Sequence, residues 1–600
     1  MRKKCLCALL TILFLLAGTL FSCSPPHTPA GQEGTEQKET DTALPVETDT
    51  EASTEETAAI VSGGIGNYRI VAYRGTSQNL QKAPGQIQSR VKLLTGVTLP
   101  IVESGEVQEG DRVITIGENS AFSVTSEATE ALDIGLYGYR AQGNFLMLLG
   151  HSEPQLERAV SKFLGVLNAS AVKNGEGTDL LLPLSAEQSL FNYDNWLTGV
   201  PRVERRYSAI YDCGDGTYML TYRNAGQEIL DELISLLEAS NYQRSQTSEI
   251  GDNRYGTYVT SGGEISYSYR VSGKLLRVVY QSYGEFRTSA PATAPETGYQ
   301  KLTDTQLSLL PLNYAAACED MTDCAGLSSV VTLEDGRFLI IDGGYTEDAN
   351  GLYNYLSDHN LRTDGIVIAA WILTHGHSDH IGCFETFSSL YGAKVTCEYL
   401  ISNALPESVT PTNETNDNTL LRLESAAVRF ANPPRILKMH EGQSVWFCNT
   451  EIQMLFTHES LYPVSPDYLN ETSLVFRVRT GGQTVLFTGD SELQSIPSLM
   501  SVFGSELKAD IFQLNHHGYS AIDSRFFELV DADILLWPSS QTTVDIRKAE
   551  SWRDGVYADL LEKVQAYYVA DGEAIVLTLP YLAGDATQAY TMDFQKRNTQ

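Results

Sequence analysis

The sequence predicts an α/β protein made of several domains. At 600 residues, the chain is too long for a single compact core, because domains usually contain about 100–200 residues. Apolar residues make up 42% of the chain and charged residues 20%, a composition typical of globular proteins. Strand-like and helix-like runs alternate along most of the sequence, which predicts α/β units. In the second half, the strand-like runs end in polar clusters, so we expect the chemistry there.

The first residues predict export and a lipid anchor. A basic start at residues 2–4 precedes an uncharged, mostly apolar run at residues 5–20, and residues 20–23 have the sequence LFSC. This arrangement resembles a bacterial lipoprotein signal (residues 1–23) whose lipobox ends at Cys23. Such a signal implies cleavage before Cys23, lipidation of that residue, and an extracytoplasmic protein anchored to the bacterial cell membrane. An ordinary cleaved signal or a short membrane helix is the alternative, although the run is short for a bilayer span of about 20 residues.

Composition and charge indicate further features of the mature chain. Residues 24–66 are expected to form an acidic, disordered tether, because nine acidic residues and one lysine lie between positions 31 and 60. The formal net charge of −33 disfavours a nucleic-acid partner, since most of such a surface repels a polyanion. The cysteines after Cys23 form no CxxC pair, which disfavours a cysteine-based zinc site. We assign no disulfide among them: Cys213, Cys318, Cys324, Cys383, Cys397 and Cys448.

Residues 67–190 are predicted to form a small α/β domain. Its order is β-α-β-β-β-α, with strands at 68–73 and 112–117, a hairpin around 142–144, and helices at 77–94 and 153–167. This order resembles the α/β module that precedes the catalytic domain in many bacterial glycoside hydrolases. The resemblance implies an accessory domain, either a spacer or docking unit or a domain that contacts carbohydrate.

Residues 200–297 are predicted to form a second small domain, of α+β type. A strand at 218–222 precedes an amphipathic helix at 226–239, and three tyrosine-rich strands follow between positions 257 and 283. Aromatic side chains on a sheet can stack sugars. Tyrosine is also common on half-buried sheets, so both interpretations stay open.

One segment of the C-terminal half contains four candidate metal ligands. A buried strand predicted at 365–373 is followed by the sequence HGHSDH, which places His375, His377, Asp379 and His380 within six residues. His375 and His377 can converge on one cation from an extended turn, and Asp379 and His380 can face a second cation. Imidazole together with carboxylate suits zinc, with manganese or iron as alternatives.

Two later strands provide candidate ligands of the same kinds. The strand predicted at 484–490 delivers Asp490, 110 residues after His380, and the strand at 511–518 delivers His516 and His517. Alone, Asp490 would be a loop-capping residue by default. With HGHSDH upstream and HHG downstream, it is predicted to be a metal ligand.

Residues 302–582 resemble the metallo-β-lactamase superfamily. The resemblance rests on the motifs IDGG (341–344), THGHSDHIG (374–382), TGD (488–490) and HHG (516–518). The closest branch looks like the extracytoplasmic domains of ComEC-type DNA-uptake proteins and the phosphorylcholine esterases, which share an N-x-x-S-L-V segment found here at 470–475. The family implies an αββα sandwich as the C-terminal catalytic domain, placed here at residues 302–585.

The resemblance also implies a role for each candidate ligand. Six residues would hold two cations: His375 and His377 the first, Asp379, His380 and His517 the second, with Asp490 bridging them. Of the two histidines in HHG, His517 is the favoured ligand and His516 the residue that faces substrate.

One position departs from the family pattern. Many members have a histidine shortly before the strand that precedes TGD, where this chain has Asn470. Asn470, His440 or His458 could complete the first metal site, although the simpler interpretation of the two histidines is that they lie on the surface. ComEC-type domains often have Gly-His-Pro downstream, whereas residues 536–538 here are LWP, which weakens DNA cleavage as the activity.

The sequence therefore predicts a membrane-anchored, extracytoplasmic hydrolase with two divalent metal ions. Its substrate would be a phosphoester or phosphodiester, either a small molecule or part of the cell envelope. A hydroxide bridging the cations would attack, Asp379 would orient it, and His516 would stabilise charge or protonate the leaving group. Asp342 would hold a ligand imidazole. The alternatives are a non-catalytic envelope protein with a vestigial metal site, a carbohydrate-binding surface protein, and a hydrolase of β-lactams or other esters.

Overall fold

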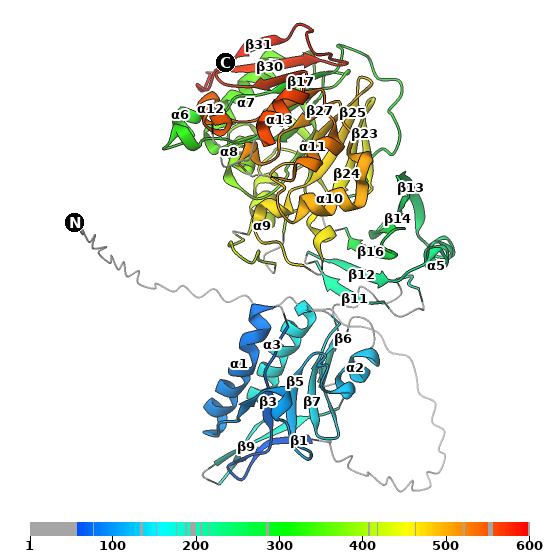
Figure 1. Cartoon of the computed structure of the whole chain (residues 1–600), viewed down its shortest axis with the longest axis vertical. Coiled ribbons are helices and arrows are strands. Elements are labelled where there is room, and N and C mark those ends of the chain that lie inside the picture. Colours follow the sequence, from blue (N-terminus) through cyan, green and yellow to red (C-terminus); the bar gives the residue numbers. More distant parts are fainter. Residues whose placement is uncertain are drawn as a thin grey trace, which may run out of the picture. The chain divides into compact units, whose positions relative to one another are not determined.

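Five β-sheets form the framework of the described chain (Figure 1). The computed structural model describes residues 57–597 except 76, 133–135, 152, 176, 186–188, 193–199, 204–206, 214, 284–286, 406–408, 417, 463, 520–521 and 550–555. The predicted signal, its Cys23 and most of the predicted tether lie outside the described residues. Residues 55–600 form one compact unit. Within the described part, no helix is both long and apolar enough to cross a bilayer.

The predicted tether extends too far, because ordered structure begins before residue 66. Strand β1 (Thr57–Ser62) pairs with β9 (Gly177–Pro183). Ile60 and Val61 of β1 are fully buried in the core of the N-terminal domain. The composition of this region is dominated by the acidic residues before β1, so the short apolar run is not recognisable from composition. The partner strand β9 lies far along the chain, so no local pattern indicates the pairing.

The described residues of the N-terminal domain form two sheets and three helices. A six-stranded sheet has the order β10-β6-β7-β5-β3-β4, and a four-stranded sheet has the order β2-β1-β9-β8. Helix α1 begins after Ser77, whose hydroxyl accepts a hydrogen bond from the N–H of Leu80, and it ends at Gly96, which has a φ of 78°. The remaining bounds are β2 (Ile65–Gly66), β3 (Arg69–Val71), α1 (Gln78–Thr95), β4 (Ile101–Val102), β5 (Val113–Ile116), α2 (Ser123–Glu130), β6 (Leu136–Gln142), β7 (Phe145–Leu149), α3 (Glu153–Ala169), β8 (Ala171–Asn174) and β10 (Leu190–Asn192).

The second domain is an antiparallel sheet with one helix packed on it. The strand order is β11-β12-β16-β15-β14-β13. Tyr267, Tyr269 and Tyr280 are at most 5% exposed and pack in the core with the helix, so these tyrosines are core residues and do not form a sugar-stacking platform. The bounds are β11 (Ala209–Asp212), β12 (Thr217–Arg223), α5 (Gln227–Glu238), β13 (Gln243–Ile250), β14 (Asn253–Thr260), β15 (Gly263–Arg270) and β16 (Leu275–Ser282).

Buried ion pairs join this second domain to the C-terminal domain. The carboxylate of Asp215 lies 3.1 Å from Lys438 Nζ. Burial would raise the pKa of Asp215, but Lys438 and Arg287 hold it below its ordinary value. On the same interface, His440 Nδ1 lies 2.6 Å from a carboxylate oxygen of Glu459. Such pairs are costly to break one partner at a time, because the other charge then stays buried and uncompensated.

The burial of His458 at this interface predicts that the free energy of unfolding depends on pH. It is 1% exposed, and burial lowers its pKa to about 4, with Lys438 and His440 reinforcing and Glu459 and Asp215 opposing the shift. In the unfolded chain the ordinary pKa of about 6.5 applies, so on acidification the unfolded chain takes up the proton first. This contribution to the free energy of unfolding is complete above about pH 6.5 and falls by about 1.4 kcal/mol per pH unit down to about pH 4.

Urea unfolding of the wild type and of His458→Gln at about pH 7 and pH 5 measures this contribution. We expect the wild type to lose about 2 kcal/mol more than the variant over this interval. Equal losses would contradict a neutral, buried His458.

The C-terminal domain is an αββα sandwich. Its two sheets have the orders β22-β21-β20-β19-β18-β17-β30-β31 and β23-β24-β25-β26-β27-β28-β29. The inner faces of both sheets share one apolar core. Helices α7, α8 and α9 pack on the outer face of the first sheet, and α10, α11 and α13 pack on the outer face of the second.

The strands and helices of this domain have the following bounds. The first sheet contains β17 (Gln306–Leu309), β18 (Ser328–Thr332), β19 (Phe338–Asp342), β20 (Ile366–Ile372), β21 (Val395–Ile401), β22 (Arg435–Leu437), β30 (Glu573–Thr578) and β31 (Gln588–Thr591). The second contains β23 (Ser444–Phe447), β24 (Thr450–Phe456), β25 (Val475–Thr480), β26 (Gln483–Phe487), β27 (Ile511–Gln513), β28 (Ile534–Trp537) and β29 (Ala566–Val569). The helices are α6 (Tyr314–Ala317), α7 (Ala349–Asp358), α8 (Ser378–Tyr391), α9 (Thr419–Ala427), α10 (Ser495–Phe503), α11 (Ser524–Val530), α12 (Gln541–Ala549) and α13 (Val556–Lys563).

One disulfide, which the sequence did not indicate, lies in this domain. It joins Cys318 to Cys324. The backbone carbonyl of Cys324 accepts hydrogen bonds from Ser539 Oγ and Thr543 Oγ1, so the disulfide loop is fixed to the start of α12. The other four cysteines of the described chain are buried thiols: Cys213, Cys383, Cys397 and Cys448.

Candidate metal centre

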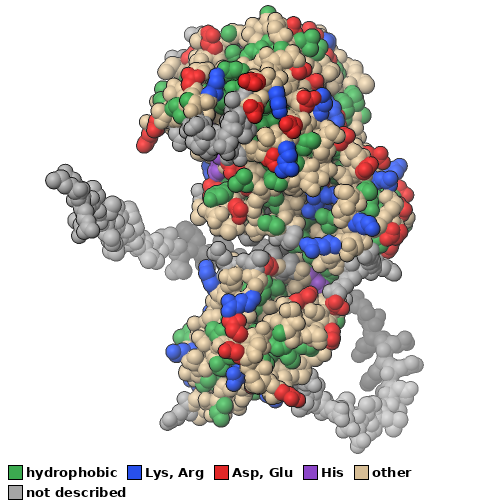
Figure 2. All heavy atoms as spheres, in the orientation of Figure 1, with side chains coloured by type: hydrophobic (Ala, Val, Ile, Leu, Met, Phe, Trp, Pro, Cys, Tyr) green, Lys and Arg blue, Asp and Glu red, His purple; other side chains and the backbone are tan. Residues whose placement is uncertain are grey.

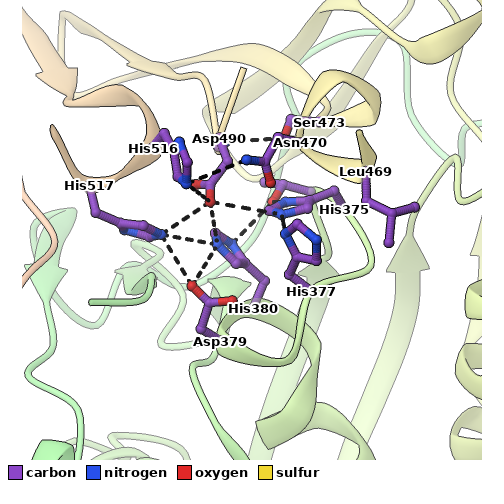
Figure 3. A network of polar contacts seen from close by, with 12 residues as sticks. His375, His377, Asp379, His380, Leu469, Asn470, Ser473, Asp490, His516 and His517 are labelled. Carbon is purple, nitrogen blue, oxygen red and sulfur yellow. Dashed lines mark hydrogen bonds and ion pairs between the residues drawn. The ribbon is translucent and has the colours of Figure 1, made fainter. Parts of the chain in front are cut away.

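Three strand ends deliver the candidate ligands to one edge of the sandwich, and a fourth, that of β19, delivers Asp342. β19 and β20 are parallel neighbours in the first sheet, and β26 and β27 are parallel neighbours in the second. The carboxyl ends of parallel neighbours lie at the same edge of a sheet. The polar segments that follow these strands therefore meet, as Figure 3 shows.

Left-handed backbone turns several of these segments into the site. Asp342 at the end of β19 has a φ of 55°. In the short helix η8 (Asn515–Gly518), His516 and His517 have φ values of 41° and 52°. Gly489 before Asp490 has a φ of 51°, and an added Cβ there would lie 3.0 Å from the nearest side-chain atoms. Residues other than glycine adopt such conformations only at a cost that surrounding contacts must offset.

The ligand atoms gather into two clusters that share Asp490. One contains Asp379, His380, Asp490 and His517, and the other contains His375, His377 and Asp490. Within each cluster, the ligand atoms all lie within 4.8 Å of one another. Asp490 Oδ2 lies 3.2 Å from Nε2 of both His380 and His517. The structure thus brings together all six residues that the sequence suggested as metal ligands.

Contacts outside the clusters fix the orientation of the imidazoles. His380 Nδ1 lies 2.7 Å from Asp342 Oδ2, so its Nε2 faces the cluster. His517 Nδ1 lies 3.0 Å from the carbonyl oxygen of Pro538. Each of these acceptors holds a proton on one ring nitrogen and leaves the other nitrogen free to bind a cation. Asp342 thus makes the contact with a ligand imidazole that was predicted from the sequence.

The charges and buried atoms of the clusters fit a divalent cation. Burial would raise the pKa of Asp490, but the imidazoles of His380 and His517 hold it well below its ordinary value. Burial lowers and Asp490 raises the pKa of His517, with a net rise to about 9. The cluster therefore favours positive charge at its centre. Asp490 faces the imidazoles through Oδ2, and its Oδ1 is buried without a hydrogen-bond partner among the described residues, so neither oxygen has a protein donor other than these imidazoles. Imidazole and carboxylate donors suit zinc and related metals.

His516 lies beside the clusters, on their more open side. Its Nε2 is 3.8 Å from Asp490 Oδ2, its Nδ1 contacts Glu492 Oε1, and its ring stacks on Tyr519 with 5.4 Å between centroids. The side chain of His516 is 24% exposed and that of His517 is 2% exposed. The structure therefore places His517 among the ligand atoms and His516 where a substrate could reach it.

Of the three residues considered for the first metal site, Asn470 alone lies at the clusters. Its Nδ2 is 3.4 Å from His516 Nε2. His440 Nε2 contacts Gln281 at 2.7 Å, and His458 Nε2 contacts Asn403 Oδ1 at 3.0 Å. His440 and His458 are 3% and 1% exposed, so their interpretation as surface histidines was wrong: both are buried near the domain interface.

Comparison with known sequences identifies the domain that contains this site. Residues 321–533 match the family described as the metallo-beta-lactamase superfamily. The C-terminal part of this chain is a metallo-β-lactamase domain. The match spans all of the candidate ligands, from HGHSDH to HHG.

Individual relatives of the metallo-β-lactamase domain are distant. The chain is 29% identical over 154 residues to "ComE operon protein 3" of Bacillus subtilis (strain 168). The matched segment covers 25% of this chain and 17% of that protein. Similar solved structures include the metallo-beta-lactamase fold protein YhfI of Bacillus subtilis, 13% identical over 45% of this chain and 98% of that one, with a TM-score of 0.28. Another is Igni18, described as a metallo hydrolase from Ignicoccus hospitalis KIN4/I, 14% identical over 45% and 98%, with a TM-score of 0.28.

Two carboxylates in the site of the metallo-β-lactamase domain were missed in the sequence. Glu414 Oε1 lies 2.7 Å from His377 Nε2, and Glu492 contacts His516 Nδ1. Glu414 lies in a polar loop without periodicity, where nothing in the sequence singles it out. Glu492 follows the TGD motif by two positions, and that proximity was the one available signal.

Proposed function

We propose that the metallo-β-lactamase domain hydrolyses phosphoester or phosphodiester bonds with two divalent metal ions, zinc being the first choice and manganese or iron the alternatives. The pair of ligand clusters that share Asp490 supports this most directly. Two such cations supply Lewis acidity and water activation for an in-line displacement, stabilising both the attacking and the leaving oxygen. Phosphoester hydrolysis is the reaction class that gains most from that arrangement.

His516 is placed to move a proton at its Nε2. Its Nδ1 contacts the Glu492 carboxylate, which holds the proton on Nδ1 in the neutral ring and leaves Nε2 toward the open side of the clusters. Next to it, the guanidinium carbon of Arg547 lies 4.0 Å from the ring centroid of Tyr519, and Tyr519 stacks on His516. The guanidinium of Arg547, which contacts the same tyrosine ring as His516, favours an anionic substrate such as a phosphoester.

The proposed place of action is the outer face of the bacterial cell membrane, with the protein held there by lipid on Cys23. The signal-like segment at residues 1–23 supports this. The Cys318–Cys324 disulfide also supports it, because disulfides persist mainly in oxidising compartments. The substrate would then be a small phosphoester or a component of the cell envelope.

The surface charge gives little support to a nucleic-acid substrate. On the face shown in Figure 2, Lys and Arg side chains are interspersed with Asp and Glu, and the net charge of the chain is −33. Long polyanions bind best where basic residues gather. Carbohydrate contact by the N-terminal domains also stays a proposal, but the buried tyrosines of the second domain cannot take part in it.

Replacing His516 should separate chemistry from metal binding. We expect His516→Ala to lower kcat by about 10²–10⁴-fold, the usual contribution of a positioned proton-transfer group, while the metal content stays at the wild-type value. Metal analysis and steady-state kinetics measure both. His359→Ala is a matched control, since His359 also stacks on a tyrosine, Tyr355, but outside the site. Loss of metal in His516→Ala would show instead that His516 is a ligand.

A panel of chromogenic substrates tests the proposed reaction. The purified full-length protein is offered a phosphodiester, a phosphomonoester, a carboxyl ester and a β-lactam, after chelation and after zinc or manganese is added back. We expect turnover of a phosphoester that chelation abolishes, that metal restores and that His377→Ala lacks. Turnover of only the carboxyl ester or the β-lactam would overturn the phosphoester assignment. A protein that holds metal and hydrolyses nothing would favour a non-catalytic envelope protein with a vestigial site.

A further inference from the structure

The two ligand clusters are unequal in their protein donors. The cluster around His380 has two imidazoles and two carboxylates, whereas the cluster around His375 has two imidazoles and only the shared Asp490. Tetrahedral catalytic zinc sites usually take three protein ligands plus water, and other first-row metals take more donors. The smaller cluster already has the three protein donors of a catalytic zinc site, so a further protein donor would either replace a water or raise the coordination number.

Asn470 lies beside the clusters and is a candidate for such a further donor. It belongs to the short helix η6 (Leu469–Thr472), is 8% exposed, and lies between His516 and His375 in the view of Figure 3. The backbone N–H of Leu469 donates to Glu414 Oε2 at 2.8 Å, and the other oxygen of Glu414 lies 2.7 Å from His377 Nε2. One carboxylate thus fixes η6 relative to an imidazole of the smaller cluster.

The contacts of the Asn470 amide determine which of its ends faces the cluster. Its Nδ2 lies 3.4 Å from Glu492 Oε1 and 3.4 Å from His516 Nε2. The Glu492 carboxylate accepts hydrogen bonds only, so the NH₂ end must point toward it. Because His516 Nδ1 contacts Glu492, His516 Nε2 is also an acceptor for this NH₂ group. The carbonyl end is therefore turned away from both groups.

The amide oxygen itself lacks a protein donor. Asn470 Oδ1 is buried and has no hydrogen-bond partner among the described residues. A buried oxygen left in this state is unusual in native proteins, and a bound cation satisfies it as a donor would. Oδ1 of Asp490, the residue that both clusters share, is in the same condition.

We infer that Asn470 Oδ1 is an oxygen ligand of the cation held by His375, His377 and Asp490. The inference rests on the metal centre of the proposed function and deepens it. An amide oxygen is a neutral and harder donor than imidazole. The smaller cluster should therefore bind zinc more weakly than the cluster with two carboxylates, and it should discriminate less between zinc and manganese. Asn470 would then take the place of the histidine that many family members have at this position, with an amide oxygen as the donor atom instead of an imidazole nitrogen.

Metal titration tests the inference without any activity measurement. The metal-free protein and its variants are titrated with zinc, and separately with manganese, in competition with a chromogenic chelator. We expect two binding events in the wild type. In Asn470→Ala the weaker event should lose about tenfold or more in affinity, since even outer-shell partners of metal ligands are worth about 10–100-fold, and the tighter event should not change. Asn470→His should tighten the weaker event for zinc beyond the wild-type value.

The outcomes distinguish this inference from the proposed function. Asn403→Ala is the matched control, because Asn403 is also a buried asparagine, contacts His458 Nε2 and lies outside both clusters. Unchanged affinities in Asn470→Ala would overturn Asn470 as a ligand and leave the two-metal centre standing. A wild type that binds no metal would overturn the proposed function itself. Tighter zinc binding by Asn470→His cannot come from a damaged fold, so that variant keeps the test decisive if Asn470→Ala is unstable.

Discussion

Asp490→Asn is expected to empty both metal positions at once. Asp490 Oδ2 lies 3.2 Å from the nearest nitrogen of His380 and of His517 and 3.8 Å from that of His375. The substitution keeps the shape of the side chain and removes the one negative charge that both clusters share. Losing one partner of a buried charge pair costs about 3–5 kcal/mol, which corresponds to about two to four orders of magnitude in metal affinity for each position. Hydrolysis should fall below detection at ordinary metal concentrations.

Metal content after dialysis, together with hydrolysis of the best phosphoester, measures the effect of Asp490→Asn. Asp510→Asn is the control, because Asp510 is another aspartate next to the second sheet, accepts a hydrogen bond from the backbone N–H of Thr484 at 2.7 Å and contacts neither cluster. We expect the control to retain the wild-type metal content. Two tightly held equivalents of metal in Asp490→Asn would contradict a ligand shared between two positions.

Asp342→Asn is expected to weaken both the fold and the metal centre. Asp342 is fully buried. Its carboxylate accepts hydrogen bonds from the backbone N–H of Thr374 at 2.7 Å and from Thr374 Oγ1 at 2.8 Å. It also lies 2.7 Å from His380 Nδ1. Asparagine tolerates the left-handed backbone at this position, so the change acts through charge and hydrogen bonding. Asparagine would place an NH₂ group where one carboxylate oxygen of Asp342 now accepts hydrogen bonds, so two donors would face each other. We expect the free energy of unfolding to fall by about 3 kcal/mol and metal affinity to fall by about 10–100-fold.

Urea unfolding of the metal-free protein and chelator competition measure the two effects of Asp342→Asn separately. Asp348→Asn is a matched control. Asp348 is a buried carboxylate that accepts from the backbone N–H groups of Asn313 and Tyr345, and burial raises its pKa to about 7. We expect this control to leave metal affinity unchanged. If Asp342→Asn loses stability but binds metal as tightly as the wild type, Asp342 does not position His380 for metal binding.

The central part of the site could be predicted from the sequence because each motif follows a buried strand. HGHSDH follows β20, the TGD that contains Asp490 follows β26, and HHG follows β27. Apolar runs with a polar cluster at one end are visible without coordinates, and parallel strands bring their carboxyl ends to one edge. The αββα sandwich was predicted from the family resemblance of these motifs, because periodicity alone does not show how the two sheets pack.

The remaining features depend on contacts between distant segments. Glu414 acquires its role by approaching His377 from a loop, and no local pattern marks such a residue. His440 and His458 looked like surface residues, because the sequence does not show that the sheet of the second domain covers them. Strand β13 is polar, with the sequence QRSQTSEI, and therefore lacks the alternation that identifies a half-buried strand.

Anomalous X-ray scattering from crystals of the purified protein soaked with zinc or manganese tests the two-metal centre directly. Two bound cations are expected at the edge of the sandwich. One should lie among Asp379, His380, Asp490 and His517, and the other among His375, His377 and Asp490, with Asn470 Oδ1 facing it. Crystals without an anomalous peak at these residues, or with a peak only elsewhere on the protein, would contradict the account of this domain as a two-metal hydrolase.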